Sequence, residues 1–130
     1  DMARAFLHSH SYTGNPLACR AALATLAIFE EDDVLAKNRV LGDKLEAALQ
    51  PVAAHPQVKN FRRRGMIFAF DAEPKIKEGF ARRFFTQALE QKLLLRPIGN
   101  TVYLMPPYIL KNDEIALLAS GTLAALEQSC

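Results

Sequence analysis

The sequence predicts an α+β fold in which helices cover one face of a small, largely antiparallel sheet. Helical and strand-like stretches follow the order helix, helix, strand, strand, helix, strand, strand, helix. Strands that directly succeed one another favour hairpins over parallel pairing. The chain has 130 residues, of which 50% are hydrophobic. This is enough for one compact domain with its own core and too little for two.

The first helix is predicted to run from Pro16 to about Glu30. Asn15 suits the N-cap position, and proline suits the first helical position. This helix is rich in alanine and is interpreted as a linker that permits close packing. Asp32 or Asp33 is expected to cap a second helix. Its apolar positions follow helical spacing, and two prolines are expected to close it: Val34, Leu41, Leu45, Ala48, Pro51 and Pro56.

Two strand-like runs at residues 58–64 and 66–71 are separated by Gly65 and predict a hairpin. A helix is expected next, from about Lys77 to Lys92. Its apolar face is interpreted as core and not as a cofactor site: Phe80, Ala81, Phe84, Phe85, Ala88 and Leu89.

A second hairpin is predicted from residues 93–96 and 101–105, with Gly99 and Asn100 in the turn. The second of these runs is rich in β-branched and aromatic residues, which favour strands. Asn112 or Asp113 is then expected to cap a last helix. One side of that helix is apolar or small: Ile115, Leu118, Ala119, Thr122 and Leu126.

Arg96 is the one charged residue in this apolar hairpin. A buried guanidinium without a partner would cost several kcal/mol, so it must be solvated or matched to an anion. Arg96 is therefore a candidate for binding a carboxylate or a phosphate. Two other interpretations stay open from the residues alone, namely a solvated arginine at a strand end and a structural ion pair.

The composition excludes several classes of partner. Sixteen basic and 14 acidic residues give a net charge of +2, so nothing favours nucleic acid or an anionic membrane. The basic run at residues 62–64 is interpreted as a solvated strand end. No apolar run reaches the roughly 18 residues of a membrane span, and no signal peptide is recognisable. We therefore expect a cytoplasmic protein.

No metal site or disulfide framework is predicted. Cys19 lies within the first predicted helix and Cys130 at the end of the chain, without metal-ligand spacing. His8 and His10 are two residues apart, but no carboxylate or cysteine lies nearby to complete a metal site.

Two strings carry a resemblance to a known family. One is His-Ser-His-Ser-Tyr-Thr-Gly-Asn-Pro-Leu-Ala-Cys at residues 8–19. The other is Leu-Arg-Pro-Ile-Gly-Asn-Thr-Val-Tyr-Leu-Met-Pro-Pro-Tyr at residues 95–108. In this order and at about this spacing they resemble the carboxyl-terminal part of class III aminotransferases, which use pyridoxal 5'-phosphate. The resemblance is greatest to the branch in biotin biosynthesis that transfers an amino group from S-adenosylmethionine to 8-amino-7-oxononanoate.

The resemblance implies that this chain, which begins without Met, is a piece of a longer homodimeric enzyme of fold type I. Residues 1–15 would be a loop left from the large domain, and residues 16–130 the small carboxyl-terminal domain. We expect the segment up to about Thr13 to be poorly ordered in the isolated chain, since its family contacts would be missing.

The resemblance also implies roles for individual residues. Ser11 would donate its hydroxyl to the cofactor phosphate of the partner subunit, with His10 in the same turn. Ser9 would lie against the substrate. Arg96 would bind the substrate carboxylate, and Tyr103 could line the same pocket.

The family's Schiff-base lysine and the acidic partner of the pyridine nitrogen are expected upstream of residue 1. We therefore expect no catalytic residue in this chain, no cofactor bound to it alone, and no activity of the fragment by itself. Two alternatives remain. The chain could be the same domain of another class III aminotransferase, or an autonomous α+β interaction domain that is not an enzyme.

Overall fold

The structure is a computed structural model, and it describes residues 13–130. It divides into two compact units, residues 1–35 and 36–130, which are described here one at a time. No helix within the described residues is both long and apolar enough to cross a membrane.

In the first unit, helix α1 (Pro16–Glu31) begins where the sequence predicts. The side-chain oxygen of Asn15 accepts hydrogen bonds from the backbone N–H groups of Leu17 and Ala18, at 3.0 and 3.1 Å. These bonds satisfy donors that the first turn of a helix otherwise leaves without partners. None of the residues of α1 is buried, and four of its large apolar side chains are exposed, Leu17 by 80%: Leu17, Leu23, Leu26 and Ile28.

The second unit is built on a three-stranded antiparallel sheet in the order β1 (Val58–Arg64), β2 (Ile67–Ala72) and β3 (Thr101–Leu104). The predicted hairpin of β1 and β2 is confirmed, with Gly65 at a positive φ of 59° in its turn. Side chains alternate between the two faces of a strand. One face accordingly carries buried residues: Phe68, Phe70, Ala72, Val102 and Leu104.

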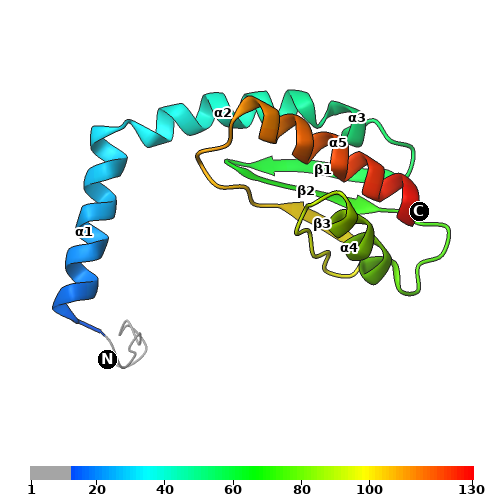
Figure 1. Ribbon diagram of the computed structural model, residues 1–130, viewed down its shortest axis with the longest axis horizontal. Coiled ribbons are helices and arrows are strands. Elements are labelled where there is room, and N and C mark those ends of the chain that lie inside the picture. The colour runs from blue at the N-terminus through cyan, green and yellow to red at the C-terminus, as the bar shows by residue number, and fades with distance from the viewer. Residues whose placement is uncertain (1–12) are drawn as a thin grey trace, which may run out of the picture. The chain divides into compact units, whose positions relative to one another are not determined.

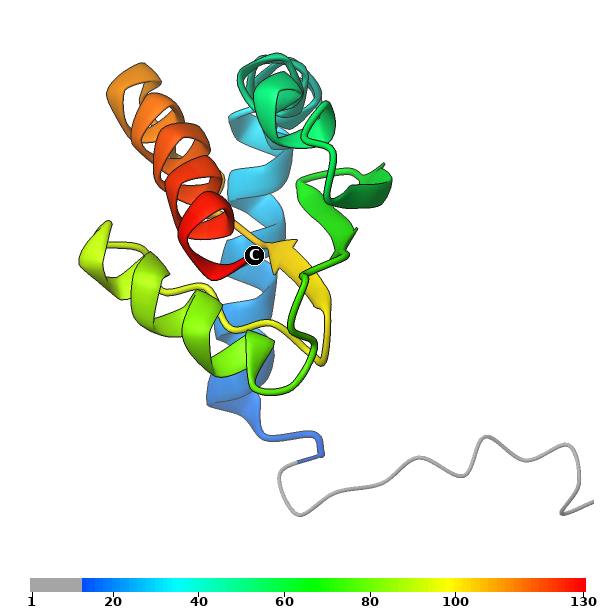
Figure 2. The same cartoon turned by 90° about the vertical axis from the view of Figure 1, so that its right-hand side faces the viewer.

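Helices cover that buried face (Figures 1 and 2). They are α2 (Val34–Ala48), α3 (Gln50–Ala53), α4 (Phe80–Glu90) and α5 (Asn112–Ser129). Figure 2 shows α4 and α5 side by side on one side of the sheet. They contribute buried side chains to the same core: Phe80, Phe84, Ala88, Ile115, Ala119 and Leu126. The predicted α+β layer with helices on one face is thus confirmed.

Three predicted helix boundaries differ from the structure. Helix α4 starts at Phe80 and not near Lys77, because Gly79 before it takes a left-handed conformation with φ 70°. The N-cap of α5 is Lys111, whose N–H donates to Glu114 Oε2 at 2.7 Å. The prediction that Pro51 closes the second helix is wrong, because Pro51 lies within the first turn of the short helix α3.

The prediction of a strand at residues 93–96, the first arm of the second hairpin, is wrong. Residues 93–96 form no strand in this structure, and only Ile98 and Thr101 exchange backbone hydrogen bonds, at 2.9 and 3.0 Å. The N–H of Leu93 instead donates to Ala88 O at 2.8 Å. Leu93 also packs on α5 at Gly121, where an added Cβ would lie 2.7 Å from Leu93 Cδ1. The start of the arm is thereby held against the helices.

The interpretation of residues 62–64 as a solvated strand end is wrong for Arg63. Its Nη1 contacts Asp43 Oδ1 at 2.7 Å and Glu46 Oε2 at 2.8 Å, both on α2. The side chain is only 18% exposed, and its guanidinium lies 5.5 Å from the ring centre of Phe68. Hydrogen bonds to Asp43 and then to Glu46 raise the pKa of the guanidinium. Arg63 therefore ties α2 to the sheet.

Arg62 also has a partner, on the face of the sheet away from the helices. It contacts Asp71 Oδ2 at 3.3 Å. Asp71 accepts further hydrogen bonds from Asn60 at 3.0 Å and Thr101 at 2.9 Å. The bonds from Asn60 and Thr101 are the main causes that lower the pKa of the Asp71 carboxyl. They link all three strands on this face.

Gly42 offers a test of the contact between Arg63 and α2, because an added Cβ there would lie 2.1 Å from Arg63 Nη2. We expect Gly42→Ala to lower the free energy of unfolding by about 1–3 kcal/mol, through displaced charged hydrogen bonds. In an Arg63→Ala background the same change should raise it, by up to about 1 kcal/mol, since alanine favours a helix over glycine. Urea unfolding of the four variants measures both effects. An equal effect of Gly42→Ala in both backgrounds would contradict this account.

Candidate functional site

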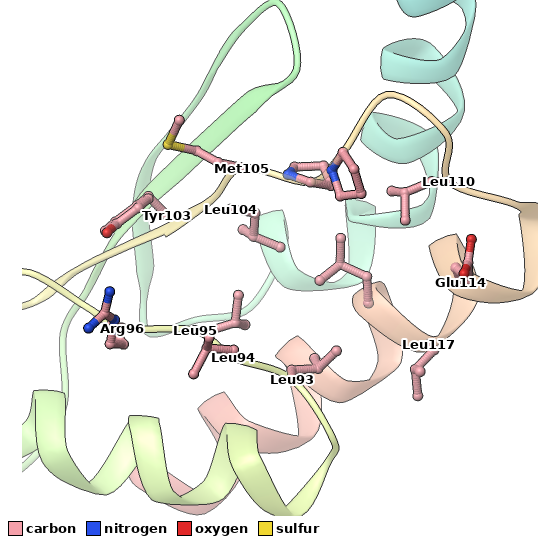
Figure 3. Close-up of a pocket in the computed structure, with 13 residues that line it drawn as sticks. Leu93, Leu94, Leu95, Arg96, Tyr103, Leu104, Met105, Leu110, Glu114 and Leu117 are labelled. Carbon is pink, nitrogen blue, oxygen red and sulfur yellow. The ribbon is translucent and has the colours of Figure 1, made fainter.

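A pocket lies between the two arms of the predicted hairpin. Its volume is about 350 Å³. The arm of residues 93–96 forms one wall, the end of β3 and residues 105–107 form another, and α5 with the loop before it forms a third (Figure 3). Because the arms meet only at Ile98 and Thr101, the space between them is left open. Thirteen residues line it: Leu93, Leu94, Leu95, Arg96, Tyr103, Leu104, Met105, Pro106, Pro107, Leu110, Glu114, Leu117 and Leu118.

Arg96 and Tyr103 lie at the same end of this pocket (Figure 3). Arg96 is exposed and Tyr103 is half-buried. Within residues 13–130, the Arg96 guanidinium makes neither an ion pair nor a hydrogen bond. The structural ion-pair interpretation of Arg96 therefore finds no partner in the described part of the chain. A solvated guanidinium at the end of a pocket is available to bind an anion.

The other charged side chain of the pocket is Glu114, and Figure 3 shows it at the far end from Arg96. Its Oε2 accepts the N–H of Lys111 at the start of α5. The carboxylate thus has a structural role as a helix cap and does not neutralise Arg96. The two charges are separated by a wall of leucine side chains.

This arrangement suits a ligand with an anionic end and an apolar body. A guanidinium presents paired donors in a plane that match the two oxygens of a carboxylate. The leucines, Met105 and the two prolines offer apolar contact along the rest of the pocket. Pro97 also restricts the backbone next to Arg96, which limits the freedom lost when a ligand binds.

Three of the predicted site residues cannot be placed. Ser9, His10 and Ser11 lie outside the residues that the structure describes, as does the segment predicted to be poorly ordered. Their roles stay predictions. The structure brings Arg96 and Tyr103 together in one pocket, while the roles assigned to them also stay predictions.

The lysines of the sequence are all exposed, and none occupies the pocket. They are Lys37, Lys44, Lys59, Lys75, Lys77, Lys92 and Lys111. Within residues 13–130, no group of three histidine, cysteine or carboxylate side chains could hold a metal ion. Cys19 and Cys130 are free cysteines.

Sequence reasoning missed the contribution of α5 and of the loop before it. Leu110, Glu114 and Leu117 line the pocket, although only the core face of the helix was predicted. Glu114 and Leu117 are three positions apart, and this spacing places them on the same side of a helix. That signal was present, but the sequence does not say which side of the helix meets residues 93–96.

Comparison with known proteins decides the family. The family model described as "Aminotransferase class-III" matches residues 1–126. The chain belongs to the class III aminotransferases. The family that the resemblance predicted is therefore confirmed. The alternative that the chain is an interaction domain unrelated to aminotransferases is wrong. Class III aminotransferases use pyridoxal phosphate as their cofactor.

Individual relatives refine this result. The chain is 44% identical over 129 residues to an adenosylmethionine-8-amino-7-oxononanoate aminotransferase of Helicobacter pylori, covering 96% of this chain and 30% of the relative. The crystal structure of the enzyme of that name from Methanocaldococcus jannaschii superposes with a TM-score of 0.83 at 31% identity. The superposition covers 95% of this chain and 30% of the chain in that crystal structure.

A third similar protein carries a different name. It is an amine transaminase from an uncultivated Pseudomonas species, whose structure was solved in the PLP-bound form. The TM-score is 0.82 at 32% identity, over 100% of this chain and 31% of that one. This chain thus spans about 30% of the length of the relatives that it matches.

The solvated state of Arg96 leads to a stability prediction. Arg96→Ala should change the free energy of unfolding of this class III chain by less than about 0.5 kcal/mol, as at other exposed positions without a partner. Arg63→Ala is the matched control. It removes a paired guanidinium whose carboxylate partners stay partly exposed to solvent, and should cost about 1–2 kcal/mol. Urea unfolding measures both. A loss for Arg96→Ala as large as that for Arg63→Ala would reveal a structural ion pair.

Proposed function

We propose that this chain is the carboxyl-terminal domain of a transaminase in biotin biosynthesis. The parent enzyme transfers an amino group from S-adenosylmethionine to 8-amino-7-oxononanoate and forms 7,8-diaminononanoate. Residues 16–130 form the small domain, and residues 1–15 form a loop from the large domain. The similarity to relatives with this activity in their names supports the proposal. The parent is a cytoplasmic homodimer in this proposal.

The unpaired guanidinium of Arg96 at one end of an apolar pocket is the observation that carries this proposal. The amino acceptor, 8-amino-7-oxononanoate, has a carboxylate at one end of an aliphatic chain. Such a molecule matches both properties of the pocket, the cation and the apolar wall. An acceptor without an anionic group would leave Arg96 without a partner.

When bound in the parent, pyridoxal phosphate would supply the carbonyl chemistry by which the amino group moves from donor to acceptor. The residues of this chain bind and orient. Arg96 holds the carboxylate of the acceptor by two parallel hydrogen bonds, and Tyr103 lines the same end of the pocket. Ser9 lies against the substrate. Ser11 donates its hydroxyl to the cofactor phosphate across the subunit interface, and His10 contributes to the same turn.

The covalent attachment of the cofactor belongs to a part of the parent outside this chain. Every lysine present here is exposed to solvent, and the exposed positions give none of them an enclosed site for a cofactor. The fragment is therefore inactive by itself.

Cofactor attachment can be tested directly. After incubation of this chain with pyridoxal phosphate and reduction with borohydride, we expect slow, scattered labelling of several surface lysines. Peptide mapping by mass spectrometry measures the distribution, and Lys92 serves as a reference for an exposed lysine near the arm of residues 93–96. Rapid labelling of a single lysine at one equivalent per chain would contradict the assignment of the cofactor lysine to the upstream part.

The role of Arg96 is tested in the parent enzyme. Arg96→Ala should lower kcat/KM for 8-amino-7-oxononanoate roughly tenfold to a hundredfold, equivalent to about 1.5–3 kcal/mol of lost charged hydrogen bonding. The half-reaction with S-adenosylmethionine should change much less. Arg96→Lys keeps the charge and loses the planar pair of donors, so it should fall between wild type and Arg96→Ala. Wild-type kinetics in both variants would eliminate the carboxylate assignment.

A second candidate function is transfer of an amino group to or from another amine by a related class III enzyme. The similarity to the amine transaminase from Pseudomonas favours this candidate. Steady-state assays of the parent with S-adenosylmethionine and with simple primary amines as donors separate the two functions. Turnover with simple amines alone would favour the second.

A further inference from the structure

The carboxylate of Asp71 on β2 binds side chains of both neighbouring strands, on the face of the sheet away from the helices. Its Oδ2 accepts a hydrogen bond from Asn60 at 3.0 Å, and its two oxygens each accept one from the Arg62 guanidinium at 3.3 Å. Asn60 and Arg62 belong to β1. Oδ1 also accepts the hydroxyl of Thr101 on β3, at 2.9 Å. Both carboxylate oxygens are thus occupied, and Arg62 matches the charge of Asp71.

Thr101 closes the turn that leads into β3. Its N–H donates to Ile98 O at 3.0 Å, and its carbonyl accepts the N–H of Ile98 at 2.9 Å. The carbonyl of Asn100 in the same turn accepts the N–H of Ala72 at 2.8 Å. The end of β2 therefore holds this turn in two ways, through the backbone of Ala72 and through the side chain of Asp71.

The two polar side chains at one end of the pocket lie next to this turn. Arg96 is two residues before Ile98, and Tyr103 is two residues after Thr101. Residues two apart in a strand project from the same face, roughly 7 Å from each other. Tyr103 accordingly shares a face with Thr101 and with Asp71, which is paired to Thr101 in the sheet. The position of Thr101 thus affects how Arg96 and Tyr103 face each other across the pocket (Figure 3).

We propose that Asp71 is a positioning residue for the end of the pocket that receives the acceptor carboxylate. Through Thr101 it fixes the turn next to Arg96, and it does not itself touch the acceptor. This inference rests on the proposed function, in which Arg96 binds that carboxylate. Paired hydrogen bonds tolerate only about 0.5 Å of misplacement, so the contacts that hold the guanidinium in place affect how tightly the acceptor binds.

The two sides of the Asp71 network separate positioning from stability. Arg62 binds the carboxylate from β1, and β1 contributes no residue to the lining of the pocket. Loss of the Arg62 side chain weakens the sheet and leaves the bond between Asp71 and Thr101 in place. Loss of the Thr101 hydroxyl breaks the bond that leads to the pocket. Both changes cost stability, but only the second is expected to alter binding of the acceptor.

Steady-state kinetics of the parent holoenzyme test this inference. Thr101→Val removes the hydroxyl and should raise KM for 8-amino-7-oxononanoate about fivefold to twentyfold, with KM for S-adenosylmethionine and kcat changed by less than about twofold. Asp71→Ala breaks the same bond from the other side and should raise the acceptor KM at least as much. Thr101→Ser keeps the hydroxyl and should stay within about twofold of wild type. Arg62→Met is the matched control, which should lower the unfolding temperature and leave both KM values unchanged.

An Arg96→Ala background separates this inference from the proposed function. There Thr101→Val should have no further effect on the acceptor KM, because the guanidinium that it positions is absent. An equal rise in both backgrounds, an equal rise with Arg62→Met or with Thr101→Ser, or an unchanged acceptor KM in Thr101→Val would each overturn the inference. If Arg96→Ala raises the acceptor KM and Thr101→Val does not, the positioning role alone fails. If Arg96→Ala itself has no effect, the proposed function fails as well.

Discussion

Close packing of Leu93 on α5 at Gly121 is the constraint on which the pocket depends. An added Cβ at position 121 would lie 2.7 Å from Leu93 Cδ1 and 3.1 Å from Gln91 Cβ, so the approach requires glycine. Leu93 is held there, and its N–H is bonded to Ala88 O, so the arm of residues 93–96 begins against the helices, and it forms no ladder with β3. Residues 93–96 and β3 lie apart on the far side of the Ile98–Thr101 pair from the turn, and the pocket lies between them.

The regular elements could be predicted because their signals are local. Asn15 and Pro16 mark a helix start through the geometry of the cap itself, and Gly65 marks a turn through its positive φ. The first arm of the second hairpin could not be predicted in the same way. Its alternation is that of a strand, but whether an extended segment finds a strand or a helix beside it depends on tertiary packing.

Charged residues show the same limit. The sequence places Arg62, Arg63 and Arg96 alike in or beside strands, yet only Arg63 reaches carboxylates on α2, with Gly42 leaving room for its guanidinium. Arg96 has no such partner among residues 13–130. Its assignment as a substrate ligand came from the resemblance of the surrounding string, while its unpaired position in an apolar pocket came only from the structure.

The central claim is that Arg96 holds the carboxylate of the amino acceptor in the complete enzyme. A crystal structure of the parent with 8-amino-7-oxononanoate bound tests it most directly. The account predicts that both oxygens of the acceptor carboxylate accept hydrogen bonds from the Arg96 guanidinium, at about 2.7–2.9 Å. A carboxylate bound elsewhere, with Arg96 paired to a carboxylate of the protein, would contradict it.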